Sequence, residues 1–491
     1  MVVVEAKLVS FDSATGNLGW LPVMASPLKA AVGGMCAGLV FFVVFVPLAV
    51  LVHQAVFFRP QLDAGLMVGA VSEVTAKIWI RVVGGESGVV EARCGEWLSE
   101  QIGVELAESR RWMTVVELPL ASCGCAPGER VTVSAVVVGS SRPEPVLLSG
   151  SFAIARRAEA RLTADDELAW VFGSCLSRMA LPPFASLAVF DHIAATVPDA
   201  AFALLLGDLM YRDLNRAWVP FLHLEPDVAY EQTWSDSSLL RFAGKVPVLT
   251  MFDDHEIEND YDRGPSPDLD YALAAYDAWM GSRNPEPVAA GSRYYTFAHS
   301  ADVAYFVLDT RSGRSRNDAP DTAGKTMLGQ DQREALLAWL VASHEAGVAF
   351  KVIGSPVSWA PHGDGHMFAT ETRDIVAFVA ASNITGVVIL SGDTHWGAAY
   401  RHGFAEPHVY ECSASPFQAL PFPHPDTLAV VEPGIKSGDD DGWSETLFLS
   451  SMSFHYGVAR VSGADKTLTC EIYGFWPWST PQMLFSSTVA V

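Results

Sequence analysis

The chain is poor in basic residues, in cysteine and in charge overall. Of its 491 residues, 32 are Lys or Arg and 56 are Asp or Glu, which gives a formal net charge of −24. This deficit of cations argues against nucleic-acid binding, because affinity for a phosphate backbone comes from Lys and Arg. With only 7 cysteines and 39 glycines, the chain is neither a disulfide-dense scaffold nor collagen-like. Its aromatic content of 11% excludes disorder as the main state, and its length predicts two or three domains.

Charged residues are absent from positions 30–58, and most of this stretch is apolar. A spanning helix needs about 20 apolar residues, so we predict a transmembrane anchor at residues 30–58 after a short N-terminal segment, residues 1–29. A buried core helix and a cleaved signal peptide are the alternatives, although a signal peptide has a shorter apolar region of about 7–15 residues. Lys29 before the stretch and Arg59 after it give a slight preference for a cytosolic N-terminus. We therefore expect a single-pass protein that contacts the lipid bilayer through this helix, with its bulk extracellular or lumenal.

Residues 65–155 alternate apolar and polar side chains at period two, as in 76–82 and 131–136. Turn residues separate these runs. Short strands with regular turns predict a small β-sandwich of the immunoglobulin or fibronectin kind. The segment carries no cluster of His, Cys and carboxylate residues along the sequence, so we interpret it as a structural or positioning module.

Residues 165–491 follow a different pattern, in which continuous apolar runs each lead into a polar cluster. Such runs are typical of strands buried on both faces. The runs are 168–172, 201–206, 246–252, 303–308, 350–353 and 386–390. Helical patterns occur at 184–196, 271–280 and 330–344, and alternation returns at 456–474, as edge strands would show. We predict a layered α/β domain with central mixed β-sheets flanked by helices.

The residues that follow the apolar runs carry chemistry. The clusters are Gly173-Ser174-Cys175, Gly207-Asp208 with Tyr211, Asp253-Asp254-His255-Glu256, Asp309-Thr310-Arg311 and Gly392-Asp393-Thr394-His395. In layered α/β sheets, ligands bind beyond the carboxyl ends of the strands. Taken alone, each Asp is a cap or turn residue, Cys175 a small buried apolar residue and His395 a satisfied histidine. Together they would gather anions that cannot all ionise without cations, which predicts a multinuclear metal site.

The order of these five motifs resembles the alkaline phosphatase D (PhoD-like) family of calcineurin-type metallophosphoesterases, over about residues 65–475. That resemblance implies a metallophosphoesterase domain preceded by a small β-sandwich. It also implies a phosphoric ester hydrolase that cleaves phosphate mono- or diesters by attack of a metal-bound oxygen on phosphorus. Phe252 departs from the pattern, since many relatives have Trp before the Asp-Asp-His motif.

The resemblance also implies a ligand set. Cys175 and Tyr211 would bind Fe(III), Asp208 would bridge to a neighbouring Ca(II), and Asp254 would bind the second ion. Asp393 and His395 would complete the two coordination spheres. Ligand type alone also allows zinc or manganese.

Further residues have roles outside this set. His255 resembles the imidazole that contacts the substrate and aids protonation of the leaving group. Asn259 and Asp260 could complete a calcium shell. Arg178, Arg311 or Arg314 could bind phosphate oxygens, although each is as well explained as a structural ion pair.

Two classes of function are compatible with these residues. The leading hypothesis is a membrane-anchored phosphohydrolase, with phospholipid head groups as one version of its substrate. The alternative is a non-catalytic metal-binding ectodomain used for adhesion or sensing. Substrate preference would be set by loops such as 264–269 and 355–367. Neither the loop 416–425 nor the acidic stretch 439–441 has a role that the sequence assigns.

Overall fold

The structure is a computed structural model that describes residues 9–11, 18–20, 62–177, 187–213, 225–361, 363–419, 421, 442–476 and 479–490. The chain divides into two compact units, Met1–Phe58 and Arg59–Val491. The first unit contributes one described feature, the antiparallel pair β1 (Val9–Phe11) and β2 (Leu18–Trp20). The anchor predicted at residues 30–58 lies outside the described residues. None of the helices in the described part of the chain has the length and apolar character needed to cross a membrane.

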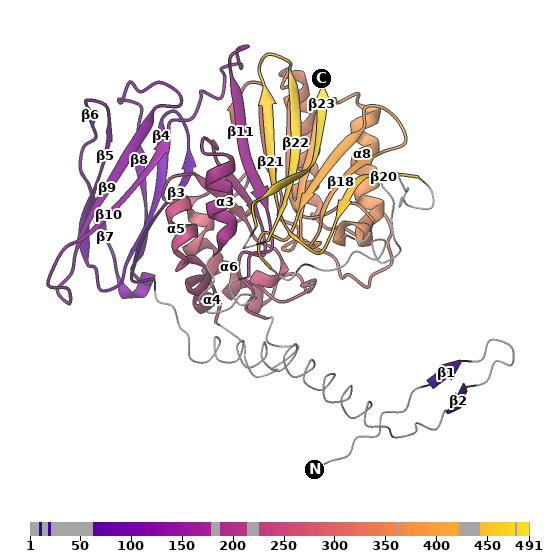
Figure 1. Ribbon diagram of the computed structural model, residues 1–491, viewed down its shortest axis with the longest axis horizontal. Coiled ribbons are helices and arrows are strands. Elements are labelled where there is room, and N and C mark those ends of the chain that lie inside the picture. The colour runs from indigo at the N-terminus through magenta and orange to yellow at the C-terminus, as the bar shows by residue number, and fades with distance from the viewer. Residues whose placement is uncertain are drawn as a thin grey trace. The chain divides into compact units, whose positions relative to one another are not determined.

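Residues 64–153 form two antiparallel sheets, which we call the two-sheet region (indigo and violet in Figure 1). One sheet has the order β3-β4-β8, and the other has the order β10-β9-β5-β6, with β7 paired to β5. The strands are β3 (Ala64–Val71), β4 (Thr75–Val82), β5 (Ser87–Cys94), β6 (Trp97–Leu98), β7 (Ile102–Glu105), β8 (Met113–Pro119), β9 (Arg130–Val138) and β10 (Val146–Ala153). Both sheets contribute to one apolar cluster that includes Ile78, Val90 and Val133. The period-two pattern arises because alternate side chains point into this cluster.

Two larger mixed sheets follow. The six-stranded sheet has the order β13-β12-β11-β21-β22-β23, and the seven-stranded sheet has the order β14-β15-β16-β17-β19-β18-β20. The strands of the first are β11 (Glu167–Gly173), β12 (Ala203–Leu206), β13 (Val248–Met251), β21 (Phe454–Ser462), β22 (Thr467–Phe475) and β23 (Gln482–Ala490). Those of the second are β14 (Tyr295–Ser300), β15 (Val303–Val307), β16 (Phe350–Val357), β17 (Val387–Gly392), β18 (Gly397–His402), β19 (Val409–Ala414) and β20 (Ser444–Ser450).

Each large sheet has a parallel core, made by β11-β12-β13 in one and by β15-β16-β17-β19 in the other. The two sheets share an apolar cluster to which Trp170, Leu204, Val352 and Leu390 contribute. A disulfide between Cys412 on β19 and Cys470 on β22 also joins them. Because both faces of the parallel strands are covered, their sequences are continuously apolar rather than alternating.

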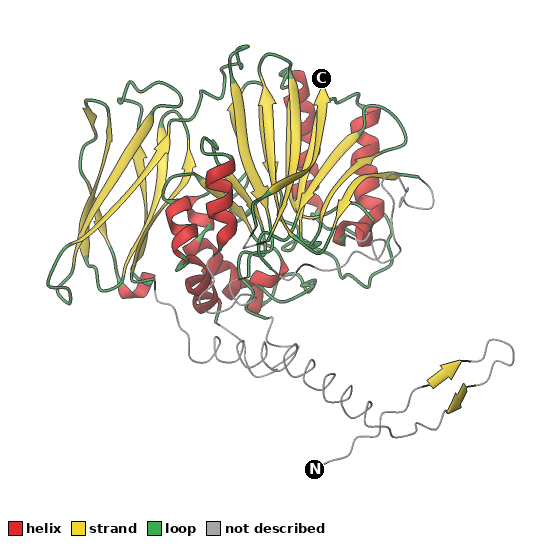
Figure 2. Ribbon diagram, in the orientation of Figure 1, coloured by secondary structure: helices red, strands yellow, loops and turns green. Residues whose placement is uncertain are grey.

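Helices lie on both outer sides of the paired sheets (Figure 2). They are α3 (Ala188–Thr196), α4 (Pro226–Trp234), α5 (Ser237–Ala243), α6 (Pro267–Trp279), α7 (Gln330–Glu345) and α8 (Ala369–Ala381), with the short 3-10 helices η2 (Glu108–Arg110), η4 (Asp254–Glu256), η5 (Gly281–Arg283) and η6 (Asp364–Phe368). Leu336 and Leu340 of α7 and Ile375 of α8 are buried in a second cluster with Ile353 and Ile389 of the seven-stranded sheet. The mixed sheets with flanking helices that the sequence predicts are therefore confirmed.

The expectation that residues 456–474 form edge strands is wrong. Strands β21 and β22 lie inside the six-stranded sheet, and β23 is its edge. In β22 burial alternates along the strand, because one face packs on the core, and an interior antiparallel strand can show this pattern too; β21 is buried on both faces over Phe454–Ala459. Of the predicted helices, α7 begins at the expected residue, Gln330.

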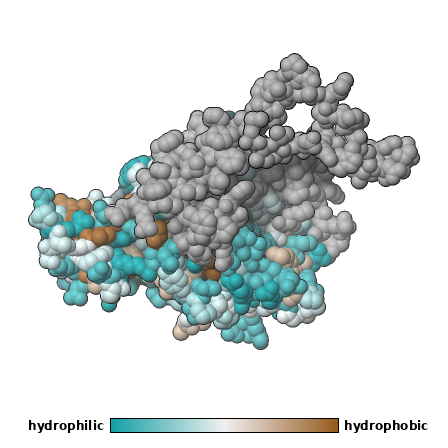
Figure 3. Space-filling model, turned by 90° about the horizontal axis from the view of Figure 1, so that it is seen from below, coloured by the Kyte–Doolittle hydropathy of each residue, from teal (hydrophilic) through white to brown (hydrophobic). Residues whose placement is uncertain are grey.

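The two-sheet region contacts the larger sheets' helices through polar and aromatic groups. The Trp79 indole donates to the carbonyl of Ala278 at 3.1 Å, and the Arg81 guanidinium lies 3.0 Å from Glu231. On the face shown in Figure 3, the described residues are mostly hydrophilic. Apolar side chains with the largest exposure, such as Leu147 at 75%, are scattered through the described residues.

Candidate metal centre

The candidate ligands follow the carboxyl ends of strands from both large sheets. Cys175 follows β11, Asp208 and Tyr211 follow β12, and Asp254 follows β13. From the other sheet, Asp393 and His395 follow β17. The three parallel strands β11, β12 and β13 are neighbours, so their ends lie at one edge, and the second sheet brings β17 to the same place.

Four of these residues have a left-handed backbone. The φ angles are 62° at Cys175, 54° at Asp208, 69° at Asp393 and 60° at His395. Non-glycine residues rarely adopt this conformation, and when they do so together they mark a functional site. Side chains hold the turns in place: Ser174 Oγ accepts from the Asp393 N–H at 2.9 Å, and Ser415 Oγ accepts from the His395 N–H at 3.0 Å.

Glu256 holds the backbone of the loops after β12 and β13 through hydrogen bonds. Its buried carboxylate accepts hydrogen bonds from the backbone N–H groups of Asp208 at 3.0 Å, Leu209 at 2.5 Å and Asp253 at 2.8 Å. One side chain thus fixes the loops after β12 and β13 relative to each other. The sequence analysis did not assign this role, because it depends on the loops' conformation.

The structure brings the six candidate ligands together. The Cys175 thiol lies 3.4 Å from Asp208 Oδ2, and the Tyr211 hydroxyl lies 3.3 Å from the same oxygen and 3.0 Å from His395 Nε2. Cys175, Asp208 and His395 have ligand atoms within 4.8 Å of one another, and so do Asp208, Asp253, Asp254 and Asp393. Asp208 belongs to both groups, which is the position of a bridging ligand.

Burial and mutual repulsion make this cluster unfavourable without a cation. Burial raises the pKa of the Cys175 thiol to about 12, with Asp393 adding to the effect. It also raises the pKa values of Asp208 and Asp393 well above the ordinary range, and neighbouring carboxylates contribute. Asp254 Oδ1 is buried and accepts no hydrogen bond from a described residue, and Arg311 Nη2 lies 3.6 Å from it. Cations bound among these groups would neutralise them and occupy that oxygen.

Asp253, next to Asp254, has a different environment. It receives a two-pronged ion pair from Arg311, whose Nε and Nη2 lie 2.5 and 3.0 Å from its two oxygens. Nη2 of Arg311 also lies 3.1 Å from Asp364, which pairs with Arg314 at 2.7 Å. Arg311 is fully buried, so its guanidinium serves these carboxylates within the structure. This is the structural ion pair that the sequence analysis kept as an alternative to phosphate binding. Arg314, a second candidate for that role, is likewise paired with Asp364, and Arg178, the third, lies outside the described residues.

Asn259 and Asp260 lie beside the cluster through their backbones. The Asp260 N–H donates to Asp254 Oδ2 at 2.5 Å, and the Asn259 N–H donates to Asp213 Oδ2 at 2.6 Å. The Asn259 amide donates to Asp260 at 2.6 Å. These contacts orient Asp254 and Asp213, and the calcium shell that the sequence suggested for Asn259 and Asp260 stays a prediction.

His255 is held by a residue that the sequence analysis missed. Its Nδ1 lies 2.7 Å from Oδ1 of the buried Asp213, and its ring lies 4.0 Å from the Tyr211 ring. Burial lowers the pKa of His255, but the carboxylates of Asp208, Asp254 and Asp213 outweigh it and raise the pKa well above its ordinary value. The position of Asp213, two residues after Tyr211 in the same loop, was a signal that could have pointed to it.

Carboxylates, a thiol, a phenol and an imidazole thus meet at the joined edges of two mixed sheets, in a site whose donors could hold more than one metal ion. The chain belongs to the PhoD-like phosphatase family, whose model matches residues 168–427. The resemblance inferred from the motifs is therefore confirmed.

Individual relatives agree with this assignment. Alkaline phosphatase D of Bacillus subtilis (strain 168) is 26% identical over an alignment that covers 34% of this chain and 34% of the relative. The match thus spans about a third of that relative's length. Two solved structures are similar in fold. The structure of PhoD has a TM-score of 0.67 at 15% identity and covers 88% of this chain and 94% of its own. A purple acid phosphatase, PPD1 from yellow lupin (Lupinus luteus) seeds, has a TM-score of 0.57 at 11% identity, with coverages of 89% and 75%.

Proposed function

We propose that this protein is a metal-dependent hydrolase of phosphate mono- or diesters. The observation that carries the proposal is the convergence of two groups of buried ligand atoms on a shared carboxylate, Asp208. Cations held by these residues would bind the phosphate group and polarise it. Membership of the PhoD-like phosphatase family supports the same reaction.

The residues fit a pair of cations of different character. Cys175 and Tyr211, with His395, offer sulfur, phenol oxygen and nitrogen, a set that suits Fe(III) because thiolate and phenolate donate electrons strongly. Asp254 and Asp393 offer oxygen, which suits Ca(II). Zinc or manganese would accept the same donors. The buried Asp254 Oδ1 accepts no hydrogen bond from a described residue and lies 3.6 Å from Arg311 Nη2, so it could still bind a cation.

When bound, the cations would activate water, orient the phosphate oxygens and neutralise the charge that develops on them. The chain's own residues would supply the rest. Because Asp213 accepts from Nδ1 of His255, the imidazole is fixed with Nε2 available for a second contact. We assign to this Nε2 the proton that the leaving alkoxide takes up. Glu256 and Ser174 would hold the loops so that the ligand atoms are already in place before substrate arrives.

The remaining parts of the chain extend the proposal. The two-sheet region would be a β-sandwich that positions the catalytic domain, proposed at residues 165–491. The apolar stretch at 30–58 would anchor the enzyme to a lipid bilayer, with the catalytic domain extracellular or lumenal. Enzyme concentrated at the bilayer surface would meet phosphate esters there.

Metal content, colour and turnover, measured together, test the proposal. The purified chain should contain more than one metal ion and should hydrolyse aryl phosphate mono- or diesters. It should also absorb visible light through charge transfer from the thiolate and the phenolate to the metal. Cys175→Ala should lose the visible band and lower turnover at least about 100-fold. Tyr410→Phe, a substitution in β19 outside the cluster, should change neither. Full metal occupancy without turnover of any ester would overturn the proposal in favour of a non-catalytic metal-binding protein.

A further inference from the structure

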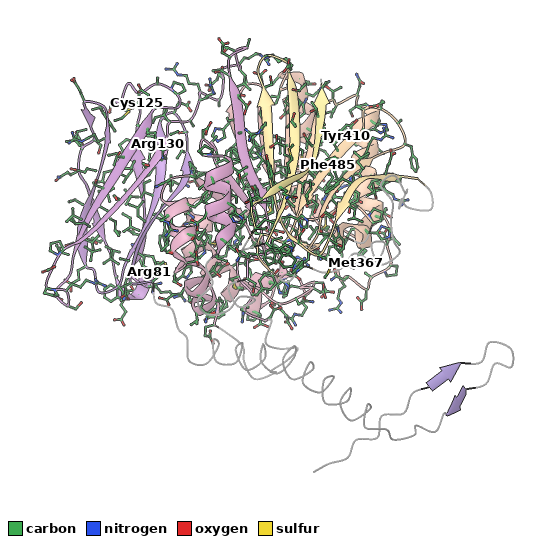
Figure 4. All side chains as sticks on the ribbon, in the orientation of Figure 1. Arg81, Cys125, Arg130, Met367, Tyr410 and Phe485 are labelled. Carbon is green, nitrogen blue, oxygen red and sulfur yellow. A yellow bond between two sulfur atoms is a disulfide. The ribbon has the colours of Figure 1, made fainter. Side chains whose placement is uncertain are left out.

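A second group of metal-binding side chains lies in the two-sheet region, outside the centre described above. Cys94, Cys123 and Cys125 have sulfur atoms within 4.8 Å of one another. Cys94 ends β5, and the other two lie in the loop between β8 and β9. Cys123 and Cys125 form a disulfide in the structure, and Cys94 is a free thiol. Figure 4 labels Cys125 beside Arg130, the first residue of β9.

A carboxylate completes the group. The Cys94 thiol lies 3.8 Å from Oε2 of Glu129, and this oxygen also accepts from the Ala126 N–H at 2.9 Å. The nearby guanidinium of Arg130 is bound elsewhere, to the hydroxyl of Ser151 at 2.8 Å and the carbonyl of Lys245 at 3.3 Å. The four groups line an open cavity of about 470 Å³, so an ion could reach them from solvent.

The local backbone is built around these sulfur atoms. Gly95 follows Cys94 with φ 57°, and Gly124 separates the other two cysteines with φ 65°. A Cβ at either glycine would meet no atom within 4 Å, so glycine is favoured there by the left-handed turn and not by crowding. The Cys125 N–H donates to Cys123 Sγ at 3.0 Å, a contact that would stabilise negative charge on that sulfur if it were kept after reduction.

Two kinds of chemistry use three neighbouring cysteines, namely thiol–disulfide exchange and metal binding. Exchange needs a reactive thiolate, and such thiolates lie beside cations or helix N-termini. Cys94 instead lies beside the carboxylate of Glu129. A carboxylate opposes formation of a free thiolate, but together with three sulfurs it supplies four ligands of the types that zinc binds.

We propose that Cys94, Cys123, Cys125 and Glu129 bind one zinc ion when the Cys123–Cys125 disulfide is reduced. Reduction takes two electrons from a thiol reductant: two reductant thiols form a disulfide, and Cys123 and Cys125 become thiols. Binding then releases three protons, one from each cysteine, and forms three zinc–sulfur bonds and one zinc–oxygen bond. The ion would tie the turn after β5 to the loop before β9, at the edge of the region's apolar cluster.

Cobalt(II), a coloured substitute for zinc, tests this site in the full chain. The Cys175→Ala background removes the thiol of the other centre. After reduction with a phosphine, this variant should bind about one Co(II) through thiolates, with an intense near-ultraviolet band that zinc abolishes. Cys94→Ser added to this background should remove the band and weaken binding at least about 100-fold, whereas Glu129→Gln should weaken it about 10-fold. Ser122→Ala, in the same loop, is the matched control and should change neither.

A second measurement does not depend on the Cys175→Ala variant. Elemental analysis of the reduced wild-type chain, loaded with zinc, should find one more zinc ion than in the chain with Cys94→Ser alone, and both should hydrolyse phosphate esters equally. The proposal is overturned if the two contain equal zinc, or if Cys94→Ser keeps the cobalt band. It is also overturned if thiol titration shows that Cys123 and Cys125 stay paired in the reduced, folded chain. Loss of ester hydrolysis in the Cys175→Ala variant alone would concern only the proposed function.

Discussion

Oδ1 of Asp213 lies 2.7 Å from Nδ1 of His255, and the exposed fractions of the two side chains are only 3% and 14%. Asp213 also accepts a hydrogen bond from the Asn259 N–H, so its carboxylate is fixed on both sides. This arrangement sets the tautomer and the direction of the imidazole without using a candidate metal ligand. We therefore regard Asp213 as a positioning residue for His255.

Asp213→Asn should lower kcat about 10- to 100-fold while metal content and thermal stability stay near those of the wild type. The loss should be largest for esters of weakly acidic alcohols and small for nitrophenyl esters, because a good leaving group needs no proton. Steady-state kinetics on a series of leaving groups measures this. Asp199→Asn, at an exposed carboxylate, is the control. An equal loss for every leaving group would show that Asp213 acts on something other than proton transfer.

Much of the larger fold could be predicted because its strands differ so clearly from their surroundings. The strand β17, for example, is continuously apolar until the residues that lead to Asp393, and burial on both faces leaves no other pattern. The position of a strand within its sheet could not be predicted in the same way. β21 and β22 alternate as edge strands do, yet they are interior, since alternation reports which faces are covered and not which neighbours are paired.

The sequence could predict which residues form the candidate site, but not the contacts that each side chain makes there. Asp253 and Asp254 are identical side chains one residue apart, yet the turn at η4 gives Asp253 two hydrogen bonds from Arg311 and leaves Asp254 Oδ1 3.6 Å from the same guanidinium, without a hydrogen bond. The left-handed backbone at Cys175 and Asp208 has no sequence signal, because such positions are usually glycine. The disulfide between Cys412 and Cys470 depends on two sheets facing each other, which spacing along the chain does not reveal.

Asp208→Asn should change stability in opposite directions with and without metal. In the metal-free chain, burial makes the ionised form of Asp208 costly and raises its pKa, so the neutral amide should stabilise the fold by about 1–3 kcal/mol. In the metal-loaded chain, the same substitution removes a bridging ligand and should destabilise the fold. Chemical denaturation before and after chelation measures both effects. Asp165→Asn, which is exposed, should show neither, and a change of the same sign in both states would contradict the bridging role.

Reduction of the Cys412–Cys470 disulfide should destabilise the two large sheets. It connects β19 to β22 through two cysteines that are 58 residues apart in the chain. Closing a loop of that size lowers the conformational entropy of the unfolded state and so stabilises the folded state by about 2–4 kcal/mol. Urea denaturation with and without a reductant measures the loss. The double variant Cys412→Ala and Cys470→Ala should be less stable than the wild type and should lose its response to reductant at this site. If reductant lowers its stability as much as that of the wild type, the stabilisation comes from the other disulfide, Cys123–Cys125.

His299 should make the stability of the fold depend on pH. The side chain is 7% exposed and stacks on Phe202 with ring centroids 4.7 Å apart, and burial lowers its pKa to about 4. In the unfolded chain the pKa of histidine is about 6.5, so between these values the unfolded state takes up a proton that the folded state does not. The contribution of His299 to the free energy of unfolding is therefore fully present above pH 6.5. It falls by up to about 3 kcal/mol as the pH drops toward 4.

His299→Phe keeps the ring and removes the titration. Its free energy of unfolding should fall less steeply than that of the wild type between pH 6.5 and 4, because one fewer proton is taken up on unfolding. Urea denaturation across this range measures both slopes, and carboxylates that titrate in both proteins cancel in the difference. Identical slopes for the wild type and His299→Phe would mean that the folded state accepts the proton at His299, which requires water or an anion to reach the cluster around Phe202.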